Sequence, residues 1–161
     1  MGYLLAIDPG CAESAYVLLD GYHVAESGKV ENDPLLEAIP TMGVDAAVIE
    51  MVESYGMAVG REVFETCVWI GRFAQTALFA KAKLYYLPRR EVKLNLCGSA
   101  RAKGSNVQRA LIDRFAQHDF RTGKGTKKAP DFFYGFKADI WAAYAVGVTW
   151  LDRSAPSGRE E

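Results

Sequence analysis

Two turn signals, Pro9-Gly10 and Asp20-Gly21, divide the start of the chain into three short, largely apolar segments, residues 3–8, 14–19 and 22–27. Each segment is too short for a stable helix and has the length and residue types of a strand. An Asp-Gly pair between two such segments is a strong signal for a β-hairpin. The first part of the chain therefore predicts three consecutive antiparallel strands.

The rest of the chain alternates between helix-like and strand-like segments. Two further apolar strands are predicted at residues 45–50 ("DAAVIE") and 83–88 ("KLYYLP"). Apolar residues recur at steps of three and four over residues 59–81, 103–117 and 138–151, which predicts three helices, and a short helical stretch follows Pro34. A polar, glycine-containing loop fills residues 118–135. This order predicts an α/β fold in which three antiparallel strands are followed by parallel strands, with helices on both faces of the mixed sheet.

Composition supports one globular domain. The chain has 161 residues, half of them hydrophobic and about a quarter charged, with a net charge of -1. These values exclude a disordered or membrane-spanning protein and fit a single domain at residues 1–153 with a flexible tail at 154–161. Three widely spaced cysteines predict neither a disulfide framework nor a zinc site. We expect a cytoplasmic protein with no membrane partner.

Three acids fall where a catalytic site could form. Asp8 and Glu50 each end an apolar strand, and Asp139 lies near the start of the last helix. If the two strands are parallel neighbours, their acids meet at one edge of the sheet. Three close carboxylates need a cation between them, and Mg²⁺ or Mn²⁺ prefers such oxygen ligands. Each acid alone is better explained by a turn, a solvated strand end or a helix start, but together they favour a metal-dependent phosphodiesterase site.

Four stretches carry a resemblance to a known family. In chain order they are "LLAIDPG", "AAVIE", "PRREVKLNLCGSARAKGSNVQ" and "KADIWAAYAVG". With this order and spacing the chain resembles, over most of its length, a RuvC-type Holliday junction resolvase of the ribonuclease-H-like superfamily, in a phage or prophage style. The resemblance implies a ribonuclease-H-like fold and cleavage of branched DNA, such as a four-way junction.

The resemblance also implies how the site is built. Asp8, Glu50 and Asp139 would be the catalytic acids and would hold two Mg²⁺ ions, with Mn²⁺ able to substitute and Asp8 bridging the pair. A homodimer would make paired nicks, as the near two-fold symmetry of a junction requires. We expect the apolar face of the helix at 59–81 to form the dimer interface.

The chain departs from the family pattern at two places. The family often has a fourth metal-site residue, Asp or His, one helical turn before the last acid, and here that position is Phe136. We expect Glu53, three residues after Glu50, to substitute as a metal ligand. Glu53 also stands where bacterial members place an aromatic that inserts into the junction, so Tyr55 and Met57 are expected to take that role.

Basic residues gather in the second half of the chain. A cluster of charge is most often a solvated surface, but an acidic site that cleaves DNA needs cations elsewhere to hold the phosphates. Lys103 matches a lysine of the family, and Lys137 is expected at the scissile phosphate. The expected DNA contacts are Arg89, Arg90, Lys93, Arg101, Lys103, Arg121, Lys124, Lys127, Lys128 and Lys137, together with Tyr55 and Met57.

Two other functions remain open on the same fold. One is an RNA-processing nuclease of the YqgF type. The other is a non-catalytic protein that binds DNA junctions, an alternative kept open by the missing ligand at Phe136.

Overall fold

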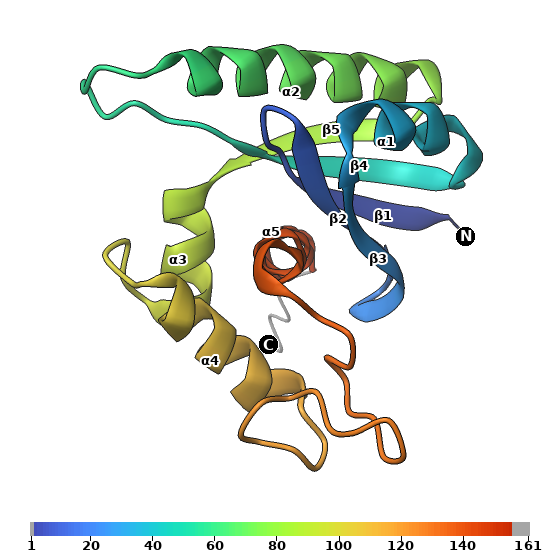
Figure 1. Cartoon of the computed structure of the whole chain (residues 1–161), viewed down its shortest axis with the longest axis vertical. Coiled ribbons are helices and arrows are strands. Elements are labelled where there is room, and N and C mark those ends of the chain that lie inside the picture. The colour runs from blue at the N-terminus through green and yellow to red at the C-terminus, as the bar shows by residue number, and fades with distance from the viewer. Residues whose placement is uncertain (1, 156–161) are drawn as a thin grey trace, which may run out of the picture.

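The computed structural model describes residues 2–155, in which five strands form one mixed sheet with the order β3-β2-β1-β4-β5 (Figure 1). β1 pairs antiparallel with β2, and β2 with β3, whereas β4 runs parallel to β1 and β5 runs parallel to β4. This topology confirms the predicted α/β class. The strands are β1 (Tyr3–Asp8), β2 (Glu13–Asp20), β3 (His23–Glu31), β4 (Val44–Met51) and β5 (Lys83–Pro88).

Helices cover both faces of the sheet (Figure 1). One face carries α1 (Asn32–Ala38), a 3₁₀ turn (Ile39–Thr41) and α2 (Arg61–Phe79). The other face carries α3 (Arg89–Cys97), α4 (Gly104–Phe115) and α5 (Ala138–Ser154). Within residues 2–155, no helix has the length and apolar character needed to cross a membrane.

The sequence prediction missed one helix, α3. Pro88 precedes its first residue, and Gly98 ends it in the left-handed conformation (φ 71°) while its N–H bonds back to the carbonyl of Leu94. These are ordinary helix boundary signals, but only Val92 of this nine-residue helix is buried, so the apolar periodicity is weak. The expected tail at 154–161 also begins inside α5, whose last residue is Ser154, and residues 156–161 lie outside the described part.

The first hairpin differs from its prediction in register. The connection consists of Gly21, at φ 57°, and Tyr22, because Asp20 pairs with His23 and belongs to the strand. The pairing of β2 with β3 then shifts by one residue between Leu18 and Leu19. β3 continues to Glu31, well past the predicted end at residue 27. The irregularity decides which side chains of β3 face α5.

Alternation along the central strands separates two hydrophobic cores. In β1, Leu4 and Ala6 belong to the core under α5, whereas Leu5 and Ile7 belong to the core under α2. Successive side chains of a strand point to opposite faces, so Asp8 lies on the α5 face. The burial pattern of the sheet therefore fixes the direction of the candidate acid.

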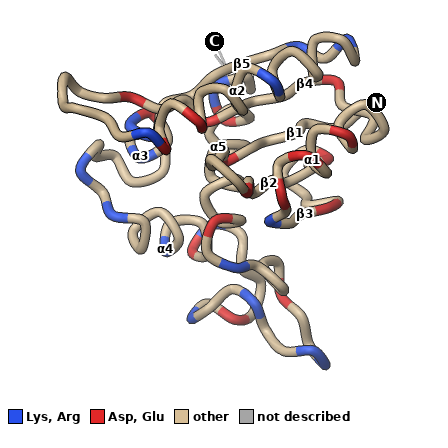
Figure 2. The backbone as a smooth tube through the Cα atoms, turned by 45° about the horizontal axis from the view of Figure 1, so that its top comes forward, with Lys and Arg blue, Asp and Glu red and all other residues tan. Residues whose placement is uncertain are grey.

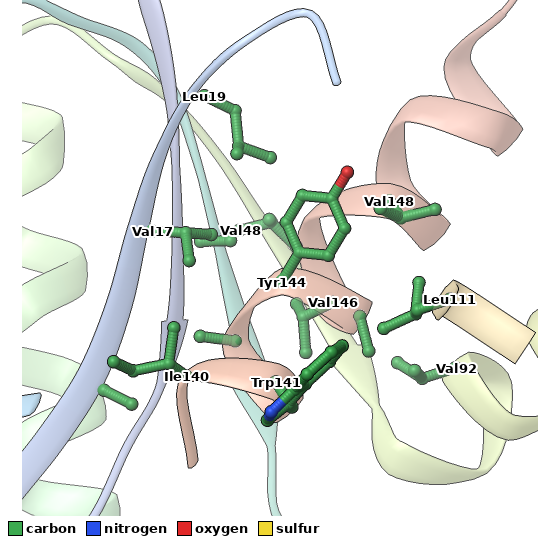
Figure 3. Packing of buried hydrophobic residues seen from close by; sticks show 14 of the residues in the cluster. Val17, Leu19, Val48, Val92, Leu111, Ile140, Trp141, Tyr144, Val146 and Val148 are labelled. Atoms are coloured by element: carbon green, nitrogen blue, oxygen red, sulfur yellow. The ribbon is translucent and has the colours of Figure 1, made fainter. Parts of the chain in front are cut away.

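α5 is the most buried helix of the fold. Figure 3 shows its Trp141 and Tyr144 between Val48 of the sheet and Val92 and Leu111 of α3 and α4. The Tyr144 side chain is fully buried, and its hydroxyl donates a hydrogen bond to the carbonyl of Tyr22, at 2.9 Å. Because α5 is held from both sides, its N-terminal turn has a fixed position over the sheet.

Close approach of α5 to the sheet depends on Gly147. A methyl group on Gly147 would lie 2.7 Å from Cδ1 of Leu19 and 3.2 Å from Cβ of Ala6. Gly71, in α2, is exposed, and a methyl group there would meet no atom within 4 Å. The two glycines occupy similar helical backbone but very different surroundings.

We predict that alanine has opposite effects at these two glycines. Gly71→Ala should raise the melting temperature by about 2–4 °C, since alanine favours a helix by about 1 kcal/mol over glycine. Gly147→Ala should lower it, because overpacking costs about 1–3 kcal/mol and exceeds that gain. Thermal unfolding followed by circular dichroism measures both. A Gly147→Ala protein that melts above the wild type would contradict the close packing of α5.

Candidate active site

Strand register brings Asp8 and Glu50 together at one edge of the sheet. Ile7 pairs with Ile49 in the parallel β1–β4 ladder, so the next residue of each strand is Asp8 and Glu50. Ala46 and Val48 of β4 face α5, and by alternation so does Glu50. Two carboxyl groups therefore lie on neighbouring parallel strands, at their carboxyl ends, on the same face.

The two carboxyl groups interact directly through a side-chain hydrogen bond. Burial, then the charges of Glu50 and Asp139, raise the pKa of Asp8 to about 7, and Arg89 opposes the shift. Burial also raises the pKa of Glu50, opposed by Arg89, by the hydrogen bond with Asp8 and by Lys93. The two carboxyl groups are therefore costly to ionise together, and a bound cation would offset that cost.

Asp139 lies in the first turn of α5 and has a different partner. Its Oδ2 lies 2.5 Å from Nζ of Lys29 in β3, in an ion pair whose two side chains are each 45% exposed. The charge of Asp139 still acts on Asp8, so the three acids share one region of the molecule. Lys29 was not among the predicted site residues.

The chain directly after Asp8 is held by a buried hydrogen-bond network. Ser14 and Asn32 are both 1% exposed, and the hydroxyl of Ser14 donates to Oδ1 of Asn32, at 2.6 Å. The N–H of Gly10 donates to Oγ of Ser14, and Nδ2 of Asn32 donates to the carbonyl of Gly10. A side chain at Gly10 would lie 2.2 Å from the carbonyl oxygen of Glu13. The Pro9-Gly10 turn is thus rigid, which fixes the end of β1.

An open groove begins at these acids, and we call it the acid groove. Its volume is about 720 Å³, and its walls include Asp8, Gly10, Lys29, Asn32 and Asp139. A smaller cavity of about 150 Å³ is lined by Glu50, Arg89, Lys93, Gln108 and Trp141. The acids therefore border both a wide groove and a basic recess.

The donor set suits one divalent cation better than two. Asp8 and Glu50 offer hard oxygen atoms in a largely buried setting that raises the pKa of both, and such oxygen atoms suit Mg²⁺ or Mn²⁺. In the chain from residue 2 to residue 155, however, no group of three or more His, Cys, Asp or Glu side chains has the spacing to hold a metal ion. Asp139 stands apart because Lys29 engages its oxygen. Its assignment as a ligand stays a prediction.

The structure does not bring Glu53 to the acids. Glu53 is exposed in the segment after β4 and is absent from the walls of both cavities that the acids line, so its role as a metal ligand stays a prediction. Phe136 is 3% exposed and packs against Phe133, Trp141 and Tyr144. Position 136 is thus part of the hydrophobic core. A metal-binding side chain at this position would have to extend out of the aromatic cluster to reach an ion.

Tyr55 and Met57 are strongly exposed, with 66% and 75% of their surface accessible. They lie in the non-regular segment at 52–60 that follows the Glu50 strand end, and Tyr55 has a positive φ of 52°. A non-glycine residue in this region is strained by roughly 1–3 kcal/mol. Their insertion into a junction stays a prediction, and their exposure leaves both side chains free for it.

The basic residues that are predicted to contact DNA form separate groups on the molecule (Figure 2). Arg89 and Lys93 lie beside Glu50, whereas Arg90 is exposed next to Glu91. Lys137 precedes α5 and lines a small cavity with Lys29 and Asp139. Arg101 and Lys103 lie in the connection from α3 to α4, with Lys103 at the start of α4.

The remaining basic residues that are predicted to contact DNA lie on the loop at residues 116–137, beyond the other end of α4. A helix of 12 residues is about 18 Å long, so this group is well separated from Lys103. The loop is ordered by its own acids, because the buried Asp131 side chain accepts hydrogen bonds from the backbone N–H groups of Gln117, His118, Asp119 and Phe132. Burial raises the pKa of Asp131, but these donors outweigh it and hold that pKa far below its usual value. The basic residues of this loop are Arg121, Lys124, Lys127 and Lys128.

Comparison with solved structures identifies the fold as RuvC-like and ribonuclease-H-like, as expected from the sequence motifs. The structure of RuvC from Thermus thermophilus superimposes with a TM-score of 0.67 and 15% sequence identity over 91% of this chain and 92% of RuvC. T. thermophilus RuvC in complex with a Holliday junction substrate gives a TM-score of 0.66 and 16% identity over 92% of each chain. No protein-family model and no curated protein matches the sequence.

We predict that Asp8→Asn stabilises the metal-free protein above neutral pH. The native pKa of about 7 exceeds that of an unfolded aspartate, so ionisation of Asp8 costs native stability as pH rises from about 4, and the full cost is present above pH 7. At pH 8 in EDTA the variant should gain on the order of 2 kcal/mol, about 4–8 °C in melting temperature, and at pH 4 almost nothing.

The exposed Glu37→Gln is the matched control and should show no such pH-dependent gain. An Asp8→Asn protein that melts below the wild type at both pH values would mean that the carboxylate is a structural anchor.

Proposed function

We propose that the protein is a metal-dependent, structure-selective endodeoxyribonuclease that resolves four-way DNA junctions by paired phosphodiester hydrolysis in the cytoplasm. The observation that carries the proposal is the Asp8–Glu50 carboxyl pair at the carboxyl ends of two parallel strands, with the raised pKa of Asp8 and an open groove beside it. The RuvC-like fold supports the same function, because one of the similar structures holds a Holliday junction substrate.

In this proposal Asp8 and Glu50 hold a divalent ion, Mg²⁺ or Mn²⁺. Such an ion stabilises negative charge on the phosphate and lowers the pKa of a bound water. Asp139 is the third catalytic acid. The resemblance implies two ions, and a second ion at Asp139 would have to displace the ammonium group of Lys29.

The basic residues have two roles. Arg89 and Lys93, beside Glu50, would bind the phosphates next to the cleaved bond, since the acids themselves repel a polyanion. Lys137 lies close enough to Asp139 to join them. The basic residues of the loop, together with Arg90, Arg101 and Lys103, would bind the duplex arms. Tyr55 and Met57 would insert between nucleotide bases at the branch point.

Observations at Phe136 and Lys29 support one alternative, a protein that binds DNA junctions without cleaving them. With a phenylalanine in the core at the fourth ligand position and a lysine on Asp139, the fold could bind junctions without cutting them. The RNA-processing nuclease has no such observation in its favour. Substrate choice separates it from the proposal.

We predict metal-dependent nicks at symmetric positions in a labelled four-way junction with Mg²⁺ or Mn²⁺, none in EDTA, and little cleavage of linear duplex or an RNA stem-loop. Asp8→Asn should lower the cleavage rate at least about a hundredfold, because it removes a metal ligand. Its junction affinity should change less than about threefold, because phosphate contacts dominate binding. Glu37→Gln serves as the control.

Tight junction binding without cleavage in either metal would refute the nuclease and support the non-catalytic alternative. Preferential cleavage of RNA would refute the DNA assignment.

We further infer a homodimer formed through α2. Phe64, Val68 and Phe79 are 63%, 62% and 80% exposed, and their spacing of four and eleven residues aligns them along one side of the helix. Leu78 extends the same apolar surface and is half exposed. Exposed aromatics in a row are costly in water and are typical of an interface between copies.

Sedimentation should therefore give a dimer for the wild type and a monomer for the double variant Phe64→Glu, Phe79→Glu, because the interface cannot accommodate the charges without large desolvation costs. Phe120→Glu, at an exposed loop aromatic, is the matched control and should remain dimeric. A wild type that sediments as a monomer with and without junction DNA would contradict the interface.

A further inference from the structure

Strand pairing sets Lys29 in one row with the first acid. Asp8 pairs with Ala15 in the β1–β2 ladder, and Ala15 pairs with Lys29 in the β2–β3 ladder. Paired residues share a face, and neighbouring strands are about 4.8 Å apart, so the Lys29 backbone lies roughly 10 Å from that of Asp8 on the α5 side. Ala15, between them, has only a methyl side chain. All three residues of this row line the acid groove.

The long side chain of Lys29 crosses this row to the last acid. Its Nζ lies 2.5 Å from Oδ2 of Asp139, which links β3 to the first turn of α5. Both side chains are 45% exposed, and an ion pair this exposed contributes little to folding stability. The pair is thus better explained by the site that it borders than by the stability of the fold.

Lys29 supplies positive charge to the third acid of the cluster, Asp139. Arg89 and Lys93 lie beside Glu50, in the cavity that these residues line together, whereas Asp139 has the ammonium group of Lys29. The position from which a fourth ligand would reach a second ion is Phe136, which is buried among aromatics. The chain itself therefore supplies cations beside the Asp8–Glu50 pair and, separately, at Asp139.

We propose that Lys29 supplies at Asp139 the positive charge that a second divalent ion would supply, so that the cluster binds one ion, at Asp8 and Glu50. This inference rests on the proposed nuclease function and defines its ion requirement. An ammonium group has three N–H donors, and Asp139 uses one of them. The other two are available to a phosphate oxygen in the acid groove, whose wall Lys29 forms. Lys29 is thereby a positioning residue that holds Asp139 and orients the phosphate.

The test is the number of Mn²⁺ ions that the DNA-free protein binds, titrated at neutral pH and followed by electron paramagnetic resonance. The wild type should bind one ion. Lys29→Met, which keeps the length of the side chain and removes its charge, should bind two, or bind a second at least about tenfold more tightly. Lys29→Arg should restore one. Lys83→Met is the matched control and should also bind one ion. In β5, Leu87 pairs with Glu50, and Lys83 lies at the opposite end of the strand.

The melting temperature separates a structural effect from this role. All four proteins should melt within about 2 °C of one another in EDTA, since the ion pair is half exposed. Two ions in the wild type, or one ion of unchanged affinity in Lys29→Met, would overturn the inference and leave the nuclease proposal standing. Failure of every variant to bind Mn²⁺ would overturn both.

Discussion

The close contact between α5 and the sheet is the constraint on which the rest of the molecule depends. Gly147 lets the helix approach Ala6 and Leu19, and Tyr144 fills the space beside them. A helix held at this distance along its whole length carries its first turn, with Asp139, to the carboxyl ends of β1 and β4. The hydrophobic core thereby sets the separation between acids that belong to three different elements, although none of the acids takes part in that core.

The electrostatics of the cluster follow from unequal surroundings. Asp8 and Glu50 are largely buried, whereas Asp139 is half exposed and ion-paired with Lys29. Burial destabilises two neighbouring negative charges, so the pKa values of Asp8 and Glu50 are raised. The charge of Asp139 is already compensated by the ammonium group of Lys29. Three acids that look equivalent in the sequence therefore have unequal electrostatic surroundings.

Local patterns predicted the architecture well because the central strands and helices are amphipathic or strongly apolar. They also indicated that Asp8 and Glu50 share an edge, since both acids end apolar strands. Lys29 could not be found this way. Counted from the hairpin turn, Lys29 would oppose Ser14 and face α2, and only the one-residue shift between Leu18 and Leu19 brings it opposite Ala15. Glu53 is close to Glu50 in sequence, but it lies exposed in the irregular segment after β4, and its role as a ligand stays a prediction.

The loop between α4 and α5 has a consequence for association with a polyanion. Asp131 anchors the backbone around it before any partner arrives, and Asp119 does the same for Thr122 and Gly125. A flexible basic segment loses conformational entropy when it settles on a phosphate chain, and this loss subtracts from its affinity. Here the loss has already occurred during folding of the protein. The loop is therefore preorganised, and in the proposed complex the path of the duplex would have to match the fixed spacing of the basic residues.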